Sequence, residues 1–230
     1  MSNGALAGSA GPHVFVASRK QLALTDDDTA HLERSLRMRD GAPLTVSDGH
    51  GAWAPGVLRT GGVVELTEAW REVPEPAAKL TVAFSLVKGS KPELVVQKLT
   101  ELGVDRIVGL VADRSVVRWD DAKIDKATQR WNRIVLEASM QSHRVRLPEI
   151  GGVAETHSFF ASEPDVSLAH FDGEPVGANH RCIAIGPEGG WSDPELDSTA
   201  GRVSLGETVL RAETAAIAAG TLLTAARRSA

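Results

Sequence analysis

Two loops near the end of the sequence contain the residues best suited to binding a ligand or to catalysis. The first, IAIGPEGGWSDPEL at residues 183–196, leaves an apolar run and places Gly186, Pro187, Gly189 and Gly190 within five residues before a helix begins. A loop so poor in side chains either turns tightly for packing or brings bare backbone against a ligand. It has neither the Gly-Lys-Ser/Thr of a Walker loop nor GxGxxG spacing, so phosphate cradling is a poor explanation.

The second loop, LGETVLRAETAA at residues 205–216, brings Arg211 and Glu213 to the start of a helix whose surface is mostly alanine. Such a helix packs at very close range, against its own loop or a partner subunit. A charged pair there is costly unless the charges meet each other or a substrate. Ligands of open α/β sheets bind beyond the carboxyl ends of strands. These two loops, with the strand end LAHFDG at residues 168–173, are therefore the candidate site.

Alternating strands and helices after residue 79 must position these loops. Ser90 and Glu93 predict a capping box at the start of the first helix, and Gly103 predicts the end of that helix. The alternation itself predicts an α/β domain with a mainly parallel sheet. The patterns place strands at 80–87, 105–112, 165–171, 181–186 and 201–206, and helices at 91–102, 121–141 and 212–226.

The preceding part of the chain predicts a different architecture, of short strands separated by turns. Asp48-Gly49 lies between two alternating runs and predicts a hairpin. One helix interrupts the strands, with Thr25 or an aspartate of the 26–28 run as its expected N-cap. Many short strands with one helix suggest a small barrel. The expected segments are a flexible leader at 1–12, the barrel at 13–73 and a proline-containing linker at 73–79.

Composition excludes several classes of protein. The 230 residues contain one cysteine, Cys182, so an intramolecular disulfide is impossible, and without a CxxC pair a structural zinc site is not expected. No run has the character of a membrane helix or a signal peptide, so the expected location is the cytoplasm. The net charge is −5, yet residues 79–146 carry 13 basic and 8 acidic side chains. This segment is either a docking face for a polyanion or a solvated helix surface.

The two late motifs together resemble a known family. IGPEGGWSDPEL followed by SLGETVLRAETAAIA is similar to the paired signature of the RsmE family, bacterial 16S rRNA uracil-N3 methyltransferases of the SPOUT superfamily. Upstream, HLERSLRMRDGAPLTVSDGHG resembles the N-terminal domain of that family, and VKGSKPELVVQKLTELGVDRIVGLVADRSVV resembles the opening of its catalytic domain. RWNRIVLEASMQSHRVRLPEI resembles the segment after that. The resemblance covers about residues 13–226.

The resemblance implies a fold, a cofactor and an assembly. Residues 13–73 would form a PUA-like β-barrel RNA-binding domain. Residues 74–230 would form a SPOUT α/β domain with a C-terminal deep trefoil knot, an exception to the unknotted rule. S-adenosylmethionine (SAM) would bind in the knot loops without a metal, and the family is a homodimer. The implied cofactor contacts are Leu168, Ile185, Gly186, Pro187, Glu188, Gly189, Gly190, Leu205, Gly206, Leu210, Ala212 and Thr214.

Methylation of uracil N3, the activity implied by the family, requires removal of a proton and stabilisation of the charge that spreads onto the carbonyl oxygens. Arg211 is assigned to charge stabilisation, with a structural ion pair as the alternative. Glu213 is assigned to positioning or proton removal, with a helix N-terminal carboxylate as the alternative.

The implied partner is a single-stranded or flipped uridine of 16S rRNA in the small ribosomal subunit. His170 is expected to be structural, and Trp191 either walls the pocket or packs in the core. Each candidate RNA contact could equally be a plain surface residue. The candidates are His31, Arg37, Lys88, Lys91, Arg114, Arg118, Gln141, Ser142, Arg144 and Arg146.

Three positions depart from the family pattern. His13 stands where the family often has arginine, Gly89-Ser90-Lys91 stands where it commonly has Gly-Asp-Arg, and Thr208 replaces a basic side chain. These departures concern RNA contacts rather than the cofactor pocket. Two other functions remain open: ribose 2′-O methylation of RNA by the same fold, and a non-catalytic RNA-binding role in ribosome assembly.

Overall fold

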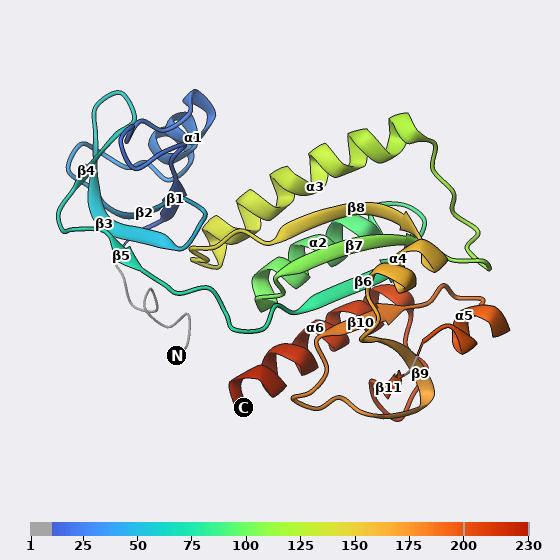
Figure 1. The fold of residues 1–230 in the computed structure, drawn as a ribbon. Coiled ribbons are helices and arrows are strands. Elements are labelled where there is room, and N and C mark those ends of the chain that lie inside the picture. Colours follow the sequence, from blue (N-terminus) through green and yellow to red (C-terminus); the bar gives the residue numbers. More distant parts are fainter. Residues whose placement is uncertain (1–10, 200, 230) are drawn as a thin grey trace. The chain divides into compact units, whose positions relative to one another are not determined.

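A computed structural model describes residues 11–199 and 201–229, and the chain separates into two compact units (Figure 1). One unit contains the chain up to Pro76 together with Leu136–Leu147, and the other contains Ala77–Val135 and Pro148–Ala230. The predicted leader at 1–12 lies outside the described residues except for its last two.

The first unit is built on a five-stranded sheet. Its strand order is β1-β2-β3-β4, with β5 paired to β3, and the β1–β2 pair is parallel while the other pairs are antiparallel. The strands are β1 (His13–Phe15), β2 (Pro43–Ser47), β3 (Ala52–Arg59), β4 (Val63–Leu66) and β5 (Arg71–Glu72). Val14, Leu44 and Leu58 are buried in its core.

Local signals in this unit work as the sequence predicts. The turn between β2 and β3 contains Gly49 at φ 76°, and the carboxylate of Asp48 accepts the backbone N–H of His50 at 2.8 Å. Helix α1 (Asp26–Ala30) is capped by Thr25, whose hydroxyl accepts the Asp28 N–H at 3.1 Å. The helix continues as a π-helical turn, η1 (His31–Ser35). The predicted hairpin and N-cap are confirmed.

The second unit contains a six-stranded sheet in which every pair is parallel. The order is β11-β9-β10-β6-β7-β8. The strands are β6 (Thr81–Ser85), β7 (Arg106–Val111), β8 (Glu149–Glu155), β9 (Val166–Pro175), β10 (Cys182–Ile185) and β11 (Gly201–Ser204). β6 is buried throughout, as a strand covered on both faces should be. The predicted parallel α/β sheet is confirmed.

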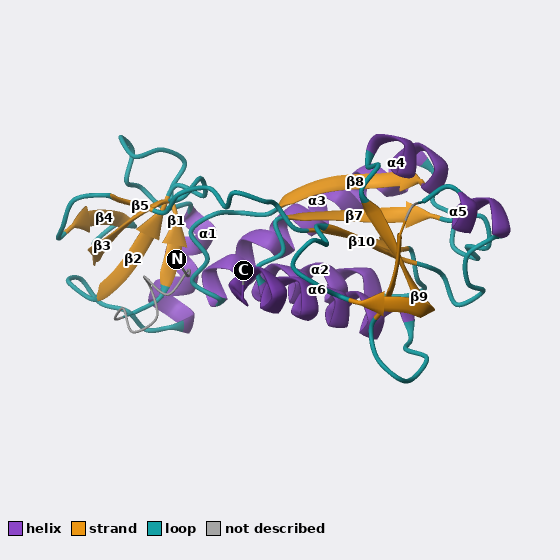
Figure 2. Ribbon diagram, turned by 60° about the horizontal axis from the view of Figure 1, so that its bottom comes forward, coloured by secondary structure: helices purple, strands orange, loops and turns teal. Residues whose placement is uncertain are grey.

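Helices α2 (Lys91–Leu102) and α6 (Ala212–Ser229) lie together on one side of this sheet (Figure 2). They approach so closely that a Cβ at Gly220 would lie 2.6 Å from Cδ2 of Leu99. This is why α6 is rich in small residues. The remaining helices are α3 (Asp121–Gln141), α4 (Thr156–Ser162) and α5 (Asp193–Asp197).

The capping box predicted at Ser90 is wrong. Ser90 has φ −89° and ψ 11°, outside the extended region that an N-cap needs, and its side chain makes no capping hydrogen bond. Gly103 does end α2, in the left-handed conformation at φ 91°. Among residues 11–199 and 201–229, no helix combines the length and apolar character that crossing a membrane requires.

Candidate functional site

The strand register brings the two candidate loops and the later part of β9 to one edge of the sheet. The expected strand end at 168–173 lies within β9, which continues to Pro175. β9 lies between β10 and β11, with Leu168 opposite both Ala184 and Arg202. The carboxyl ends of parallel neighbours point the same way, so the segments that follow these strands gather at that edge. The pairing of β9 with β11 then shifts register, and β9 continues to Pro175 beside Ser204.

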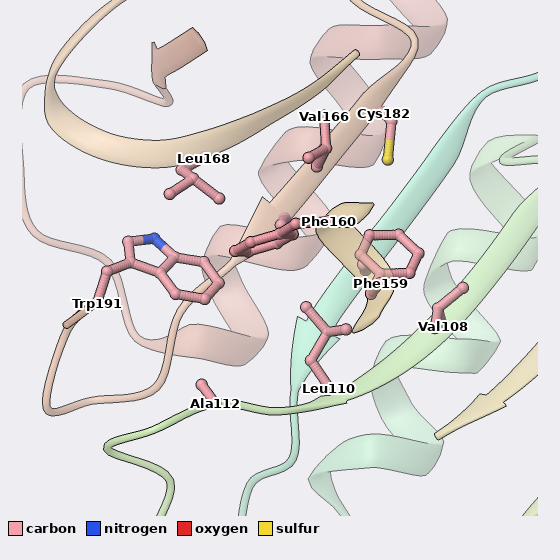
Figure 3. Packing of buried hydrophobic residues seen from close by; sticks show 11 residues of the cluster. Val108, Leu110, Ala112, Phe159, Phe160, Val166, Leu168, Cys182 and Trp191 are labelled. Atoms are coloured by element: carbon pink, nitrogen blue, oxygen red, sulfur yellow. The ribbon is translucent and has the colours of Figure 1, made fainter. Parts of the chain in front are cut away.

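The glycine loop after β10 rests on a buried tryptophan. A Cβ at Gly186 would lie 3.0 Å from the indole ring of Trp191, which is only 5% exposed. The indole N–H donates to the carbonyl of Ala169 at 3.2 Å, and the ring meets Phe160 edge-on with centroids 5.8 Å apart. Figure 3 shows the indole beside Phe160 and Leu168. Of the two roles considered for Trp191, the structure supports core packing.

Two glycines present open backbone at this edge. Gly190 has φ 71° and Gly206 has φ 152°, and a Cβ at either would meet no atom within 4 Å. Gly189 differs, because a Cβ there would lie 3.3 Å from Cβ of Arg114. Its carbonyl also accepts a hydrogen bond from Arg114 Nη1 at 3.3 Å. Among the predicted cofactor-binding glycines, Gly190 and Gly206 are therefore the two whose backbone faces free space.

The other predicted cofactor-binding residues differ in how far they are exposed to solvent. Leu168, Ile185, Pro187 and Ala212 are buried. Leu205 and Leu210 are half-buried, which leaves them able to contact a ligand. Glu188 and Thr214 are exposed.

A buried carboxylate fixes the glycine loop to the loop after β7. Glu195 is 0% exposed and accepts the backbone N–H groups of Ser192 at 2.8 Å and Asp113 at 3.1 Å. The Ser192 hydroxyl accepts the Glu195 N–H at 3.3 Å, which completes a capping box at α5. It also donates to Asp113 at 2.5 Å, and this bond lowers the pKa of the Asp113 carboxyl. The sequence predicts Asp193 or Ser192 as the N-cap of this helix, with Glu195 in its first turn, and Ser192 is the residue that caps it. The bonds to Asp113 join residues far apart in the sequence, so no local pattern predicts them.

Arg211 and Glu213 lie where α6 begins. Arg211 is exposed, and its carbonyl accepts the Ala215 N–H at 2.8 Å. Glu213 Oε1 pairs with Nζ of Lys91 at 2.9 Å, and this hydrogen bond is the main cause that lowers the pKa of Glu213, with Arg211 contributing further. A carboxylate whose pKa is lowered is a weak base, so the arrangement favours positioning over proton removal.

Comparison with known proteins identifies the family. A model of the RNA methyltransferase domain matches residues 74–224. Ribosomal RNA small subunit methyltransferase E of Mycobacterium bovis is 33% identical, with 86% of this chain and 84% of that protein aligned. The Bacillus subtilis protein of the same name is 30% identical over 84% and 85%. The chain belongs to the ribosomal RNA small subunit methyltransferase E family.

Solved structures agree with this assignment and confirm the resemblance that the motifs indicate. A Legionella pneumophila protein assigned as a methyltransferase, solved with the cofactor SAM bound, superposes with a TM-score of 0.79 and 29% identity over 93% of this chain and 97% of that one. The family member from Neisseria gonorrhoeae, bound to S-adenosyl methionine, has a TM-score of 0.81 at 24% identity, with 93% and 97% covered. The second unit therefore has the α/β fold with a parallel sheet of these methyltransferases.

The candidate RNA contacts are distributed over both units of the chain. In the second unit, Lys88, Arg114 and Arg118 are exposed. In the first unit, His31, Arg37, Gln141 and Ser142 are exposed. All seven stay predictions.

Arg144 and Arg146 are held by the first unit. Arg144 is only 5% exposed, and its Nε donates to the Arg146 carbonyl at 2.9 Å. Arg146 is half-buried and donates to the carbonyl of Val73 at 3.1 Å. An RNA contact by Arg144 would require its guanidinium to leave these partners, and both contacts stay predictions.

Two of the histidines considered in the sequence, His13 and His170, make contacts typical of a structural role. His13 is 2% exposed, hydrogen-bonds Thr45 at 2.9 Å and stacks on His143. Burial lowers the pKa of His13 to about 4, so at neutral pH an uncharged ring stands where the family often has arginine. His170 bonds Asp172. Among the described residues, no three His, Cys, Asp or Glu side chains gather to hold a metal ion.

Proposed function

We propose that this protein methylates N3 of a uridine in 16S rRNA of the small ribosomal subunit. The observation that carries the proposal is the match, over most of the chain, to enzymes named for methylating small-subunit ribosomal RNA. Family membership makes the protein a methyltransferase with SAM as the methyl donor. The choice of uracil N3 rests on the family resemblance of the two late loops.

The open backbone at Gly190 and Gly206 fits SAM. Both glycines have conformations that side chains rarely adopt, and both face free space. Leu205 and Leu210, half-buried in the adjacent loop, would contact the adenine, and Ile185 would close the pocket from below. Bound SAM supplies a methyl group on a positively charged sulfur.

The residues at the start of α6 would act on the base. Loss of the N3 proton leaves negative charge on the flanking carbonyl oxygens, and the exposed guanidinium of Arg211 would stabilise that charge. Glu213, kept ionised by Lys91, would orient a reactant rather than accept the proton. Proton removal is therefore left to solvent or to a group of the RNA.

The finer architecture belongs to the same proposal: a deep trefoil knot within residues 74–230 and a PUA-like barrel at 13–73 that binds RNA. The knot is supported by a close backbone crossing, because a Cβ at Gly173 of β9 would lie 2.4 Å from the carbonyl carbon of Val203 in β11. The barrel is supported by the five-stranded sheet of the first unit.

The working form of the enzyme would be a metal-free homodimer in the cytoplasm, acting on assembled or late-assembling small subunits. Phe171 and Val209 support a second copy, because they are 82% and 95% exposed although both are large and apolar. Phe171 lies in β9, at the register shift of its pairing with β11, and Val209 lies in the loop after β11.

The proposal is tested by methyl transfer from labelled SAM to small subunits that lack the modification, followed by digestion to nucleosides. We expect 3-methyluridine, and we expect a chelator to leave the rate unchanged. A ribose-methylated nucleoside would instead favour 2′-O methylation. No labelled product, together with no thermal shift on SAM addition, would favour a non-catalytic assembly role.

A further inference from the structure

Lys91 and Glu213 pair across the starts of two neighbouring helices. Lys91 is the first residue of α2 and Glu213 is the second residue of α6. We infer that Lys91 is a positioning residue for methyl transfer: it holds Glu213 so that the second carboxylate oxygen receives a hydrogen bond from a reactant. The inference rests on the proposed function and replaces the RNA contact predicted for Lys91.

Stability does not account for this pair. The Lys91 side chain is 41% exposed and the Glu213 side chain is 14% exposed, and solvent at the lysine limits what the ion pair contributes to folding. Lys98 and Glu101, later on α2, form a pair of the same kind at 2.8 Å with the lysine 39% exposed. The two pairs differ in place, because only Lys91–Glu213 lies at the edge of the sheet where the candidate loops gather.

Glu213 is incomplete as it stands. Oε1 is held by Lys91, but Oε2 is buried and has no hydrogen-bond partner among the described residues. A buried acceptor without a partner is unfavourable, so a donor from outside the chain should satisfy it. Both reactants carry such donors: SAM has an ammonium group, and a nucleotide has N–H and O–H groups. With Oε1 fixed, Oε2 is also fixed in direction.

The positive charges near Glu213 keep its carboxylate ionised and therefore able to accept that hydrogen bond. Lys91 from α2 and Arg211 just before α6 both stabilise the carboxylate form. Loss of Lys91 removes the largest of these effects, so the pKa of Glu213 rises. Because the ionised form is the one that accepts, activity is present above this pKa and is lost as the pH falls through it. Without Lys91 the loss therefore occurs at higher pH.

The test compares Lys91→Met with Lys91→Arg and with the matched control Lys98→Met. Single-turnover transfer from labelled SAM to unmodified small subunits is measured across pH. We expect Lys91→Met to slow transfer by about tenfold or more and to move the acid limb of the rate profile to higher pH. Lys91→Arg should restore most of the rate, and Lys98→Met should resemble the wild type.

A Glu213→Gln background separates the effect of the Lys91–Glu213 pair from any other effect of Lys91. There, adding Lys91→Met should change nothing further, because the group that it positions is already altered. An effect of Glu213→Gln on SAM affinity would identify SAM as the donor, and an effect on the rate at saturating SAM would identify the nucleotide.

Two results would overturn the inference. One is an unchanged rate and acid limb in Lys91→Met. The other is a smaller salt dependence of RNA binding with normal single-turnover transfer, which would make Lys91 a phosphate contact. Failure of the proposed function has a separate signature, since the wild-type protein would then give no methylated nucleoside at all.

Discussion

Arg211 is exposed at the start of α6 while its own backbone carbonyl anchors the helix. The side chain is thus free to reach a substrate from a fixed base. We predict that Arg211→Ala lowers single-turnover methyl transfer by about 100-fold or more, the scale of losing one preorganised charge-stabilising donor. SAM affinity should remain near that of the wild type, and Arg211→Lys should recover only part of the rate because it lacks the planar fork. A normal rate in Arg211→Ala would assign the role to another residue.

Gly190 allows a test of the cofactor site that separates steric blocking from backbone strain. We predict that Gly190→Val weakens SAM binding by about tenfold or more, because the new side chain would occupy the open space against the loop backbone. Isothermal titration calorimetry measures this directly.

The control for that substitution is Gly61→Val. Gly61 has φ 79° and, like Gly190, nothing within 4 Å of a would-be Cβ, but it lies in the first unit between β3 and β4. The two substitutions carry similar strain, so equal SAM affinities in both variants would contradict a cofactor role for Gly190.

At the scale of elements, the clasp made by Glu195 joins the glycine loop to the loop after β7. A glutamine can accept only part of what this carboxylate accepts from the Ser192 and Asp113 N–H groups. We predict that Glu195→Gln lowers the free energy of unfolding of the second unit by about 1 to 3 kcal/mol and weakens SAM binding, because the loop is held less firmly. Urea denaturation and calorimetry measure the two effects. Asp193→Asn, at an exposed position of the same helix, should change neither.

The helices and strands also show which signals the sequence carries. The parallel sheet and α3 follow from apolar runs and helical periodicity. Strand β8 was not anticipated, because EIGGVAE contains two glycines and is exposed or half-buried along its length. Ser90 and Ser192 have the same Ser-x-x-Glu spacing, yet only Ser192 has the extended backbone that lets its hydroxyl cap the helix. The local pattern therefore predicts where a capping box is possible, but the backbone conformation of the serine decides whether it forms.

At the candidate site, the sequence predicts the positions of the loops more reliably than the contacts that their side chains make. Arg211 and the glycine loop were identified from residue type and spacing alone. The Lys91–Glu213 pair joins residues 122 positions apart in the sequence, so no local pattern could reveal it. Arg144 is predicted as an RNA contact or a plain surface residue, but it is only 5% exposed.

At the scale of the whole molecule, binding to ribosomal RNA should depend on salt through the exposed cations. We predict that Lys88→Ala with Arg118→Ala lowers the slope of log affinity against log salt by about 1.4 to 1.8, at about 0.7 to 0.9 for each phosphate that the protein no longer neutralises. SAM affinity should not change. Filter binding at several salt concentrations gives the slope, and Lys126→Ala on α3 is the control for loss of an exposed positive charge. The same slope in all variants would mean that Lys88 and Arg118 are solvated surface residues that do not contact RNA phosphates.

The strand order described above also orders events during synthesis. β6, β7 and β8 are neighbours in the sheet and leave the ribosome one after another, so they can pair as they emerge. β9 has β10 and β11 as its partners, and both come later in the chain. A released chain that ends near residue 180 should therefore resist protease over β6 to β8 while β9 is still cut. An enzyme that modifies ribosomal RNA would thus have no complete active site until its last helix, α6, has left a ribosome.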